Sequence, residues 1–321
     1  MAETINVQEL VAAFGRYQET NNKTIYQKLI QKTFTQGFMT TIVQDGDYRA
    51  SQSIIDDLVQ GFQKDWTPKG KAKFTPIEIR HRRHKFDKEF YPDEIMASWL
   101  GFLADETKDR KDWPITRYIL EKLILPKVEE NREMKLIANG VYAAPTEGEA
   151  QATGLSMDGF LTILQAKEDA GTSNINFIEL EPFTTDNIVD EIEKFVDAID
   201  ELYQGMDIPI FISNKWYKAY KRKYRELYGT NLDYLDSKNS DKVDYSNNRL
   251  QVLPSMASSD RIVCTPKENF IRLIKQNDGA SKVFIESVDR KVKIWADWHE
   301  NVGFAIEEVV WTNALNESSG S

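Results

Sequence analysis

The chain has 321 residues, of which 41% are apolar, and its formal net charge is −10 at pH 7. No stretch approaches the roughly 18 consecutive apolar residues of a membrane-spanning helix, and the N-terminus lacks the basic start and apolar block of a signal peptide. Cys264 is the only cysteine, which excludes an intrachain disulfide framework and a thiolate metal cage, so we expect a soluble protein from a reducing compartment.

Charge is distributed unevenly along the chain. Residues 69–90 and 215–225 are basic, whereas residues 179–207 are acidic. Proteins that hold duplex nucleic acid tightly carry a surplus of Lys and Arg, but this chain has 41 Lys and Arg against 51 Asp and Glu. Separate basic and acidic blocks suit contacts between copies of one chain. Charge alone leaves open the alternative that the blocks are only solvated faces.

The first third of the chain predicts an arm followed by a two-stranded extension. Residues 1–36 are polar and hold two short helical patterns, and residues 37–45 are a β-rich run that ends at a turn signal. After an irregular excursion the chain returns through FTPIEIRHRRHKFDKEF, residues 74–90. Both faces of this run are largely polar at strand spacing, so burial within its own subunit would leave charges unpaired. We therefore expect residues 37–90 to project as a long two-stranded arm.

Two helices are predicted next. Residues 91–105 carry a proline and acids in the first turn, which are helix-start signals. Residues 112–140 form the longest helical pattern, with Pro126 as the expected kink and Gly140 as a left-handed C-cap. A helix of this length would allow other elements to pack against it.

A mixed α/β region follows. Residues 184–205 predict one helix, residues 208–213 a buried strand and residues 214–229 a second helix, and residues 250–254 and 261–266 are short strands. The first helix has an apolar face that points to a core, made of Ile188, Ile192, Phe195, Ile199 and Leu202.

The last part of the chain predicts a closing sheet. Residues 282–311 are expected to form three antiparallel strands, with turns at Asp289-Arg290 and near Glu300-Asn301. One face of this sheet is apolar and carries Val292, Ile294, Ala296 and Trp298.

No metal site, cofactor site or catalytic site is predicted. His81 and His84 are the nearest approach to a metal motif, but residues three apart on a strand point to opposite faces, and the arginines between them would repel a cation. The sequence has no nucleophile elbow, phosphate-binding glycine loop or HExxH motif. His299 is expected to be a packed or hydrogen-bonded histidine.

The helix at 214–229 mixes basic and aromatic side chains, as nucleic-acid-binding segments do. Trp216, Tyr220 and Tyr224 recur every four residues, however, which favours a helix that buries its aromatic face and keeps its lysines in water. Nucleic-acid binding through the two basic blocks stays open, and it predicts a duplex affinity that falls steeply with salt.

The order of these elements resembles that of the major capsid proteins of tailed bacteriophages, whose Hong-Kong-97-type fold is shared with encapsulins. Residues 74–103 are similar to the return strand of the family's extended loop and the start of its peripheral domain. Residues 112–145 are similar to its spine helix, and residues 199–229 to the helix, strand and helix of its axial domain. Residues 250–274 and 283–311 are similar to the closing axial strand and the return to the peripheral sheet.

The resemblance implies an α+β fold in six parts: an N-terminal arm (1–36), an extended loop (37–90), a peripheral domain with the spine helix and an antiparallel sheet (91–145), an α/β axial domain (146–281), return strands to the peripheral domain (282–311) and a flexible tail (312–321). The implied function is that of a non-enzymatic shell subunit. Pentamers and hexamers of such a subunit would form an icosahedral capsid around double-stranded DNA, assembled in the cytoplasm of a host bacterium.

A shell also implies contacts between copies. Four basic side chains of the extended loop are expected to pair with three acids of a neighbour's spine helix: Arg80, Arg82, Arg83 and Lys85 with Glu129, Glu130 and Glu133. Other implied partners are a portal, decoration proteins and packaged DNA, which a net acidic subunit would contact weakly. Many relatives carry a long N-terminal scaffolding segment, but here the arm begins at Met1, so a separate scaffolding protein, or none, is expected. An encapsulin-type compartment with an enzyme cargo stays open as an alternative.

Overall fold

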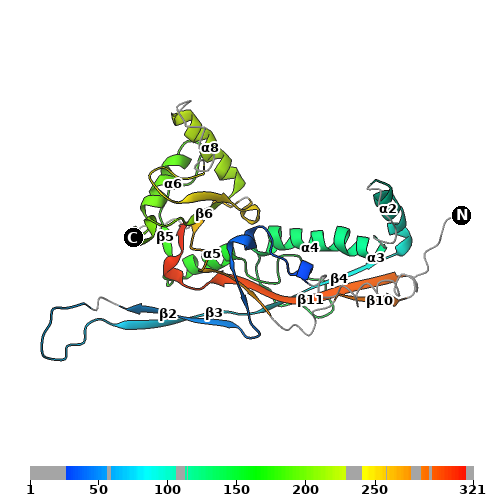
Figure 1. The fold of residues 1–321 in the computed structure, drawn as a ribbon, viewed down its shortest axis with the longest axis horizontal. Coiled ribbons are helices and arrows are strands. Elements are labelled where there is room, and N and C mark those ends of the chain that lie inside the picture. The colour runs from blue at the N-terminus through cyan, green and yellow to red at the C-terminus, as the bar shows by residue number, and fades with distance from the viewer. Residues whose placement is uncertain are drawn as a thin grey trace.

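The computed structural model describes residues 27–55, 59–105, 113, 115–228, 241–257, 259–275, 283–288 and 291–315. An elongated body carries a long helix along one side, a second lobe rises from one end of the body, and a two-stranded hairpin projects beyond it (Figure 1). Parts of several predicted features lie outside the described residues, namely residues 1–26 of the arm, residues 112 and 114 of the long helical pattern, residue 229 at the end of the helix predicted for 214–229, the turn at Asp289-Arg290 and residues 316–321 of the tail.

The body is built around one long strand, β11 (Lys291–Phe304). It pairs antiparallel with three other strands: β10 (Phe284–Val288), β4 (Arg82–Phe90) and β9 (Phe270–Ile274). Strand β9 pairs in parallel with β1 (Thr40–Val43). The apolar face predicted for β11 is confirmed, because Val292, Ile294, Ala296 and Trp298 are all buried.

The second turn predicted for the closing sheet is wrong. Strand β11 continues through Glu300 and Asn301 as far as Phe304, because Glu300 extends the buried face and is neutralised there. The next strand, β12 (Trp311–Asn313), belongs to the sheet of the lobe, so its last two residues are buried and are no part of a tail.

The prediction that residues 80–90 project from the body is also wrong. Strand β4 pairs with β11 over its whole length. Residues 80 and 81 lie between β3 and β4, so the alternation of faces restarts there instead of continuing from the preceding strand. In the new alternation His84, Phe86 and Phe90 pack toward the interior, and the charged residues between them point to solvent. Burial of one face therefore leaves no unpaired charge inside.

The projecting arm is the shorter hairpin that precedes β4. Strands β2 (Tyr48–Ile55) and β3 (Ala72–Ile79) pair with each other in antiparallel register. Residues 59–71 at its tip are exposed. Figure 1 shows the hairpin reaching away from the body, and Ile79 at its base is only 5% exposed and packs on Gly303 of β11.

Helix α2 (Pro92–Asp105) is confirmed as predicted, and the long helix is confirmed over the residues described. The long helix consists of α3 (Ile115–Tyr118), the π-helical η2 (Ile119–Ile124), α4 (Leu125–Asn131) and the π-helical η3 (Arg132–Leu136). In an α-helix the ring of Pro126 would crowd the carbonyl one turn earlier. The wider π turn that ends just before it relieves this contact, and the helix continues through the proline as α4.

The lobe is built from a five-stranded sheet and two amphipathic helices that pack on it. Its strands are β5 (Asn176–Ile178), β12, β8 (Val263–Cys264), β6 (Pro209–Ile212) and β7 (Arg249–Val252), in that spatial order. Its helices are α6 (Ile188–Asp197), the short α7 (Glu201–Gln204) and α8 (Asn214–Tyr228). Trp216 and Tyr220 are buried, which confirms that the aromatic face of α8 points to the core.

The single helix predicted for residues 184–205 is wrong. Helix α6 ends at Asp197, and the side chain of Asp200 accepts a hydrogen bond of 2.8 Å from the Leu202 N–H, so it caps a separate helix. Leu202 is consequently 76% exposed and takes no part in the apolar face. Gly205 ends the second helix, as predicted.

The end of the long helix is joined directly to α5 (Phe160–Ala170). The last carbonyls of one helix accept hydrogen bonds from the first N–H groups of the other, at 2.9 Å from Phe160 to Ile137 and 3.0 Å from Leu161 to Ala138. The prediction that Gly140 is left-handed is wrong. Glycine is required at this position because any side chain would collide with the Leu136 carbonyl. Small extra elements complete the fold: η1 (Thr35–Phe38), η5 (Pro254–Met256) and η6 (Glu307–Val309).

Gly159→Ala is expected to lower the free energy of unfolding by about 1–3 kcal/mol, since the new methyl group would overlap the backbone oxygen of Ala138. Urea denaturation at pH 7 measures the change. Gly101→Ala in α2 is the matched control: it meets open space and should be neutral or stabilise by up to about 1 kcal/mol. Equal effects of both variants would contradict this close approach.

Candidate functional site

The structure places Arg83 and Lys85 on the outer side of the sheet and Arg80 in the connection before β4, where other groups of the same chain contact them. Arg83 Nη2 lies 2.6 Å from Asp297 Oδ2, and Lys85 Nζ lies 2.6 Å from Asp87 Oδ2. Arg80 pairs with Glu78 at 2.7 Å. Arg82 lies over the ring of Tyr142, 3.5 Å from its centroid. The four side chains therefore have contacts within the chain that the sequence did not predict.

The three predicted acids are not equivalent. Glu129 and Glu130 are exposed on the long helix, and Glu130 pairs with Lys127 at 2.6 Å. Glu133 is only 8% exposed and accepts hydrogen bonds from Thr35, so its expected role as a surface partner of a neighbour is wrong. It lies on the inner side of the helix, where it binds the N-terminal segment.

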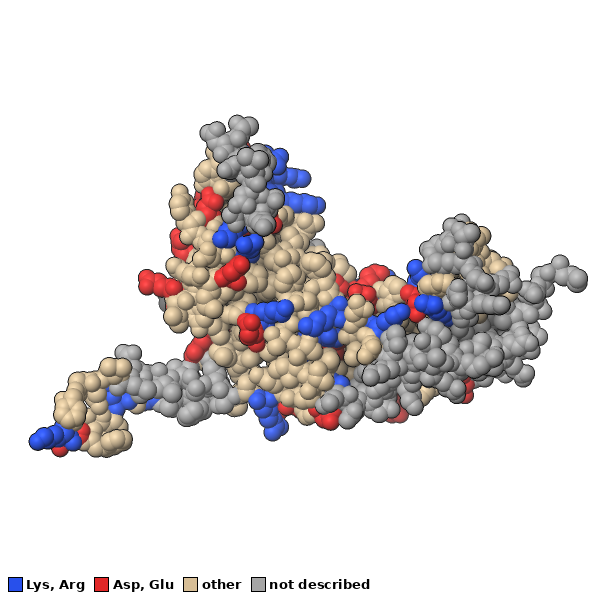
Figure 2. All heavy atoms as spheres, in the orientation of Figure 1, with Lys and Arg blue, Asp and Glu red and all other residues tan. Residues whose placement is uncertain are grey.

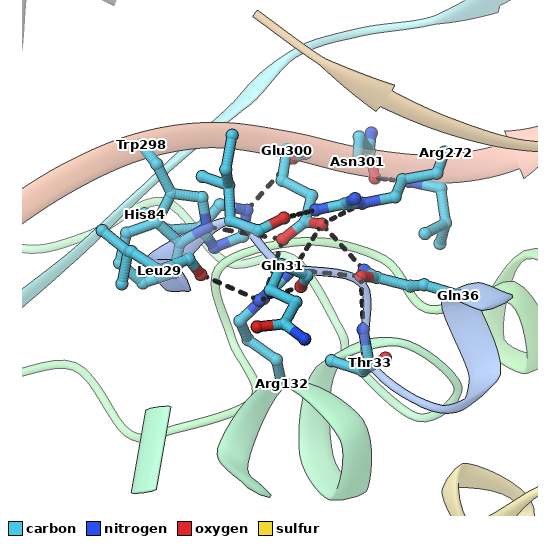
Figure 3. Close-up of polar contacts among 12 residues, drawn as sticks. Leu29, Gln31, Thr33, Gln36, His84, Arg132, Arg272, Trp298, Glu300 and Asn301 are labelled. Atoms are coloured by element: carbon cyan, nitrogen blue, oxygen red, sulfur yellow. Dashed lines mark hydrogen bonds and ion pairs between the residues drawn. The ribbon is translucent and has the colours of Figure 1, made fainter. Parts of the chain in front are cut away.

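The most distinctive site is a buried polar junction, which we define as Gln36, His84, Arg132, Arg272 and Glu300 together with the groups they contact (Figure 3). Arg132 holds the Glu300 carboxylate with two hydrogen bonds, at 2.7 Å from Nη2 and 3.0 Å from Nε. Arg272 Nε and Gln36 Nε2 each donate to the same carboxylate at 2.7 Å. The Glu300 carboxylate is therefore surrounded by donors from the long helix, β9 and η1.

The same arginines bind the backbone of the segment before η1. Arg132 Nη1 donates to the carbonyls of Leu29 and Gln31, at 3.0 Å each, and Arg272 Nη2 donates to Ile30 at 2.6 Å. Thr35 is fixed by Glu133 and lies 2.7 Å from the Ser255 hydroxyl, which belongs to the connection from the lobe. The junction thus joins the N-terminal segment, the long helix, the body sheet and the lobe.

Electrostatic balance explains how this junction can be buried. Glu300 is 2% exposed, and burial on its own would raise the pKa of its carboxyl group. The positive charges of Arg132 and Arg272 outweigh burial and hold this pKa well below its ordinary value, so the carboxylate stays ionised. Both arginines bind this one carboxylate, and the buried Glu133 beside them is bound by Thr35.

His84 completes the junction as a neutral ring. Burial lowers its pKa. Its Nε2 lies 3.1 Å from the backbone oxygen of Glu300, which can only accept, so Nε2 carries the proton. Its Nδ1 then accepts from the Ser156 hydroxyl at 2.8 Å, and its ring stacks on Trp298. His81, by contrast, contacts the carbonyls of Gln44 and Gly46 outside the junction.

Sequence reasoning missed this junction, although one signal was present. Glu300 follows Trp298 on the alternation that buries Val292, Ile294 and Ala296, and a carboxylate at a buried position requires a buried cation. Within the described residues no group of three or more His, Cys, Asp or Glu side chains is placed to hold a metal ion. No helix of the described part is long and apolar enough to cross a bilayer.

No family model matches the sequence, and no curated protein matches it. Solved structures do match its fold. The procapsid of satellite phage P4, which includes the size determination protein, has 11% identity and a TM-score of 0.53, and the match covers 92% of this chain and 98% of that one. A structure of Gordonia phage Cozz has 8% identity and a TM-score of 0.53, with 89% and 87% covered. The capsid of Myoviridae phage XM1 has 11% identity and a TM-score of 0.50, with 87% and 90% covered.

These matches show the fold class of the chain: its helices and strands are arranged as in the shell proteins of bacteriophage capsids. More narrowly, the chain has the Hong-Kong-97-type capsid fold that the order of its elements implied.

Glu300→Gln is expected to lower the free energy of unfolding by about 3–5 kcal/mol at pH 7, because two buried arginines lose their counter-charge. The folded pKa of Glu300 lies below its ordinary value of 4.5, so its contribution is present above pH 4.5 and is lost as the pH falls toward the folded pKa. The difference between the wild type and the variant should therefore shrink in acid. Urea denaturation at pH 7 and pH 3 measures both effects.

The matched control is Glu130→Gln, which removes the exposed carboxylate that pairs with Lys127. A loss of roughly 0–1 kcal/mol is expected there. A Glu300→Gln loss as small as the control's, or one that does not change with pH, would contradict the electrostatic role of the junction.

Proposed function

We propose that this chain is the major capsid protein of a tailed phage or prophage. Copies assemble into rings of five and six, and the rings close into an icosahedral shell around double-stranded DNA. In this shell the body is the peripheral domain, the long helix is its spine and the lobe is the axial domain. The observation that carries the proposal is the projecting β2–β3 hairpin on a body of capsid fold.

The tip of this hairpin is not suited to an isolated molecule. Val59, Phe62 and Trp66 are 89%, 96% and 92% exposed, so three large apolar side chains lie in water within one short segment. A two-stranded ribbon is also marginally stable by itself. Both features favour a neighbouring copy that covers the tip and supports the strands.

Charge supports a role of the sheet's outer side in the same contacts. The side chains of Arg80, Arg83 and Lys85 remain 68%, 63% and 70% exposed despite their partners within the chain. They can therefore be shared with exposed acids of an adjacent copy, for which Glu129 and Glu130 remain the proposed partners. Such exposed pairs set orientation more than affinity.

The net charge of −10 favours a shell that holds DNA without binding it tightly. The phage assignment is further supported by the phage structures that share the fold. We infer no catalytic activity and place the protein in the virion capsid. A scaffolding protein, a portal and decoration proteins are the further partners that a capsid of this kind would have.

The purified chain is expected to form rings of five or six copies, or closed shells, as its concentration rises. Size-exclusion chromatography with light scattering, followed by electron microscopy, tests this. A monomer at every concentration would contradict the proposal. Particles isolated from the native host should protect double-stranded DNA from nuclease; shells that hold only protein cargo would favour an encapsulin-type compartment.

Phe62→Ser combined with Trp66→Ser is expected to reduce the assembled fraction at least about tenfold, since the tip loses apolar area that a neighbour would bury. The free energy of unfolding of the monomer should not change, because both side chains are exposed. Lys64→Ser at the same tip is the matched control and should assemble normally. Normal assembly of the double variant would show that the tip makes no contact with a neighbour.

A further inference from the structure

Helix α8 carries three cations on its outer face that have no partner in the described part of the chain. Lys218, Arg222 and Arg225 follow one another at spacings of four and three, so they form one exposed line on the face opposite the buried Trp216 and Tyr220. We call this line the basic stripe. No carboxylate among the described residues pairs with any of the three.

The other cations of α8 are already used within the chain. Lys215 pairs with Asp260 at 3.3 Å, Lys221 with Asp241 at 3.2 Å and Lys223 with Asp186 at 3.7 Å. The cations of α8 therefore form two groups: three that pair with acids of the lobe, and the basic stripe, which pairs with no acid of the described ranges.

Helix α6 carries the reverse pattern. Asp190, Glu193 and Asp197 are spaced three and four apart; Asp190 and Asp197 are exposed and Glu193 is half-buried, and no cation among the described residues pairs with them. We call this line the acidic stripe. The one lysine of the helix, Lys194, pairs with Glu191 at 2.6 Å and so leaves the stripe uncompensated.

Electrostatics within the acidic stripe is consistent with missing cations. Partial burial, and then the nearby charges of Asp190, Asp244 and Asp197, raise the pKa of Glu193. Like charges have been brought together on this surface, and no cation of the described ranges pairs with them. A partner that supplies cations would remove the repulsion.

The two stripes lie on separate helices of the lobe. In Figure 2, Lys and Arg side chains protrude from one side of the lobe, along α8, whereas Asp and Glu side chains gather on the opposite side, toward α6. Each stripe spans eight residues from its first to its last member, or about 10 Å of helix, so the two lines match in length as well as in sign. One molecule cannot bring them together, but two copies in a ring can.

We propose that the lobe makes a head-to-tail contact in which the basic stripe of one copy lies against the acidic stripe of the next. The contact is heterologous, so repeating it generates a ring, and it requires the same two surfaces on every copy. The proposal rests on the assembly of rings proposed above and adds which surfaces of the lobe meet. The contact should favour ring formation mainly at moderate salt, because dissolved ions screen exposed charges over distances of about 8–10 Å.

The competing occupant of the basic stripe is the phosphate backbone of DNA. Three cations would give a duplex affinity that falls with salt at a slope of about −2.7 on logarithmic axes. DNA would leave the acidic stripe without a role, whereas a second copy accounts for both stripes. The second copy is therefore the occupant that the charges favour.

A charge-swap experiment tests the contact in the full chain. One variant carries K218E, R222E and R225E, a second carries D190K, E193K and D197K, and a third combines all six substitutions and so keeps the net charge at −10. Each triple variant presents two surfaces of the same sign and is expected to lose at least about tenfold in assembled fraction, measured by light scattering and electron microscopy. The combined variant restores opposite signs and should recover assembly to within about threefold of the wild type.

Circular dichroism and urea denaturation establish whether the variants are folded; five of the six side chains are exposed and Glu193 is half-buried, so a loss of stability from E193K is measured in the same experiment. Normal assembly of either triple variant would overturn the contact. A combined variant that is folded but fails to assemble, when both triple variants also fail, would overturn the contact as well. Unchanged assembly with weakened duplex binding by the first variant would assign the basic stripe to DNA. A wild-type chain that stays monomeric contradicts ring assembly itself, and the contact with it.

Discussion

The carboxylate of Glu300 and the two arginines that surround it determine how the parts of this molecule are held together. Arg132 comes from the long helix and Arg272 from β9, and both also bind carbonyls of the N-terminal segment. A buried ion pair adds little net stability compared with apolar packing, but removing one partner is strongly destabilising. The junction therefore specifies one arrangement of helix, sheet and N-terminal segment.

This arrangement separates an interior in which charges are matched from surfaces on which they are not. Inside the body, Arg132 and Arg272 both bind the carboxylate of Glu300. Outside, the hairpin tip keeps apolar side chains in water, and the two stripes of the lobe keep charges without partners among the described residues. In the proposed ring of identical copies, both kinds of surface would gain partners. The net acidic charge is compatible with DNA as the contents of the proposed shell.

Much of the fold could be predicted from local patterns, because apolar periodicity directly reports which face is buried. The faces of β11 and α8, helix α2 and the long helix were recognisable in this way. Strand β4 was not recognisable from its pattern, because its buried face contains a histidine and charged neighbours. Its partner strand is also about 200 residues away in the chain. The junction was missed for a related reason. Glu300, Arg132 and Arg272 come together only through tertiary pairing, and each alone reads as an ordinary solvated charge.

The central claim is that the projecting hairpin is completed by a neighbouring copy. A reconstruction of the assembled particle by electron cryomicroscopy tests this most directly. The account predicts a closed shell of five-copy and six-copy rings in which the tip at residues 59–71 lies against an adjacent copy and Phe62 and Trp66 are buried. A particle in which the hairpin folds back onto its own body, or in which its tip remains in solvent, would contradict it.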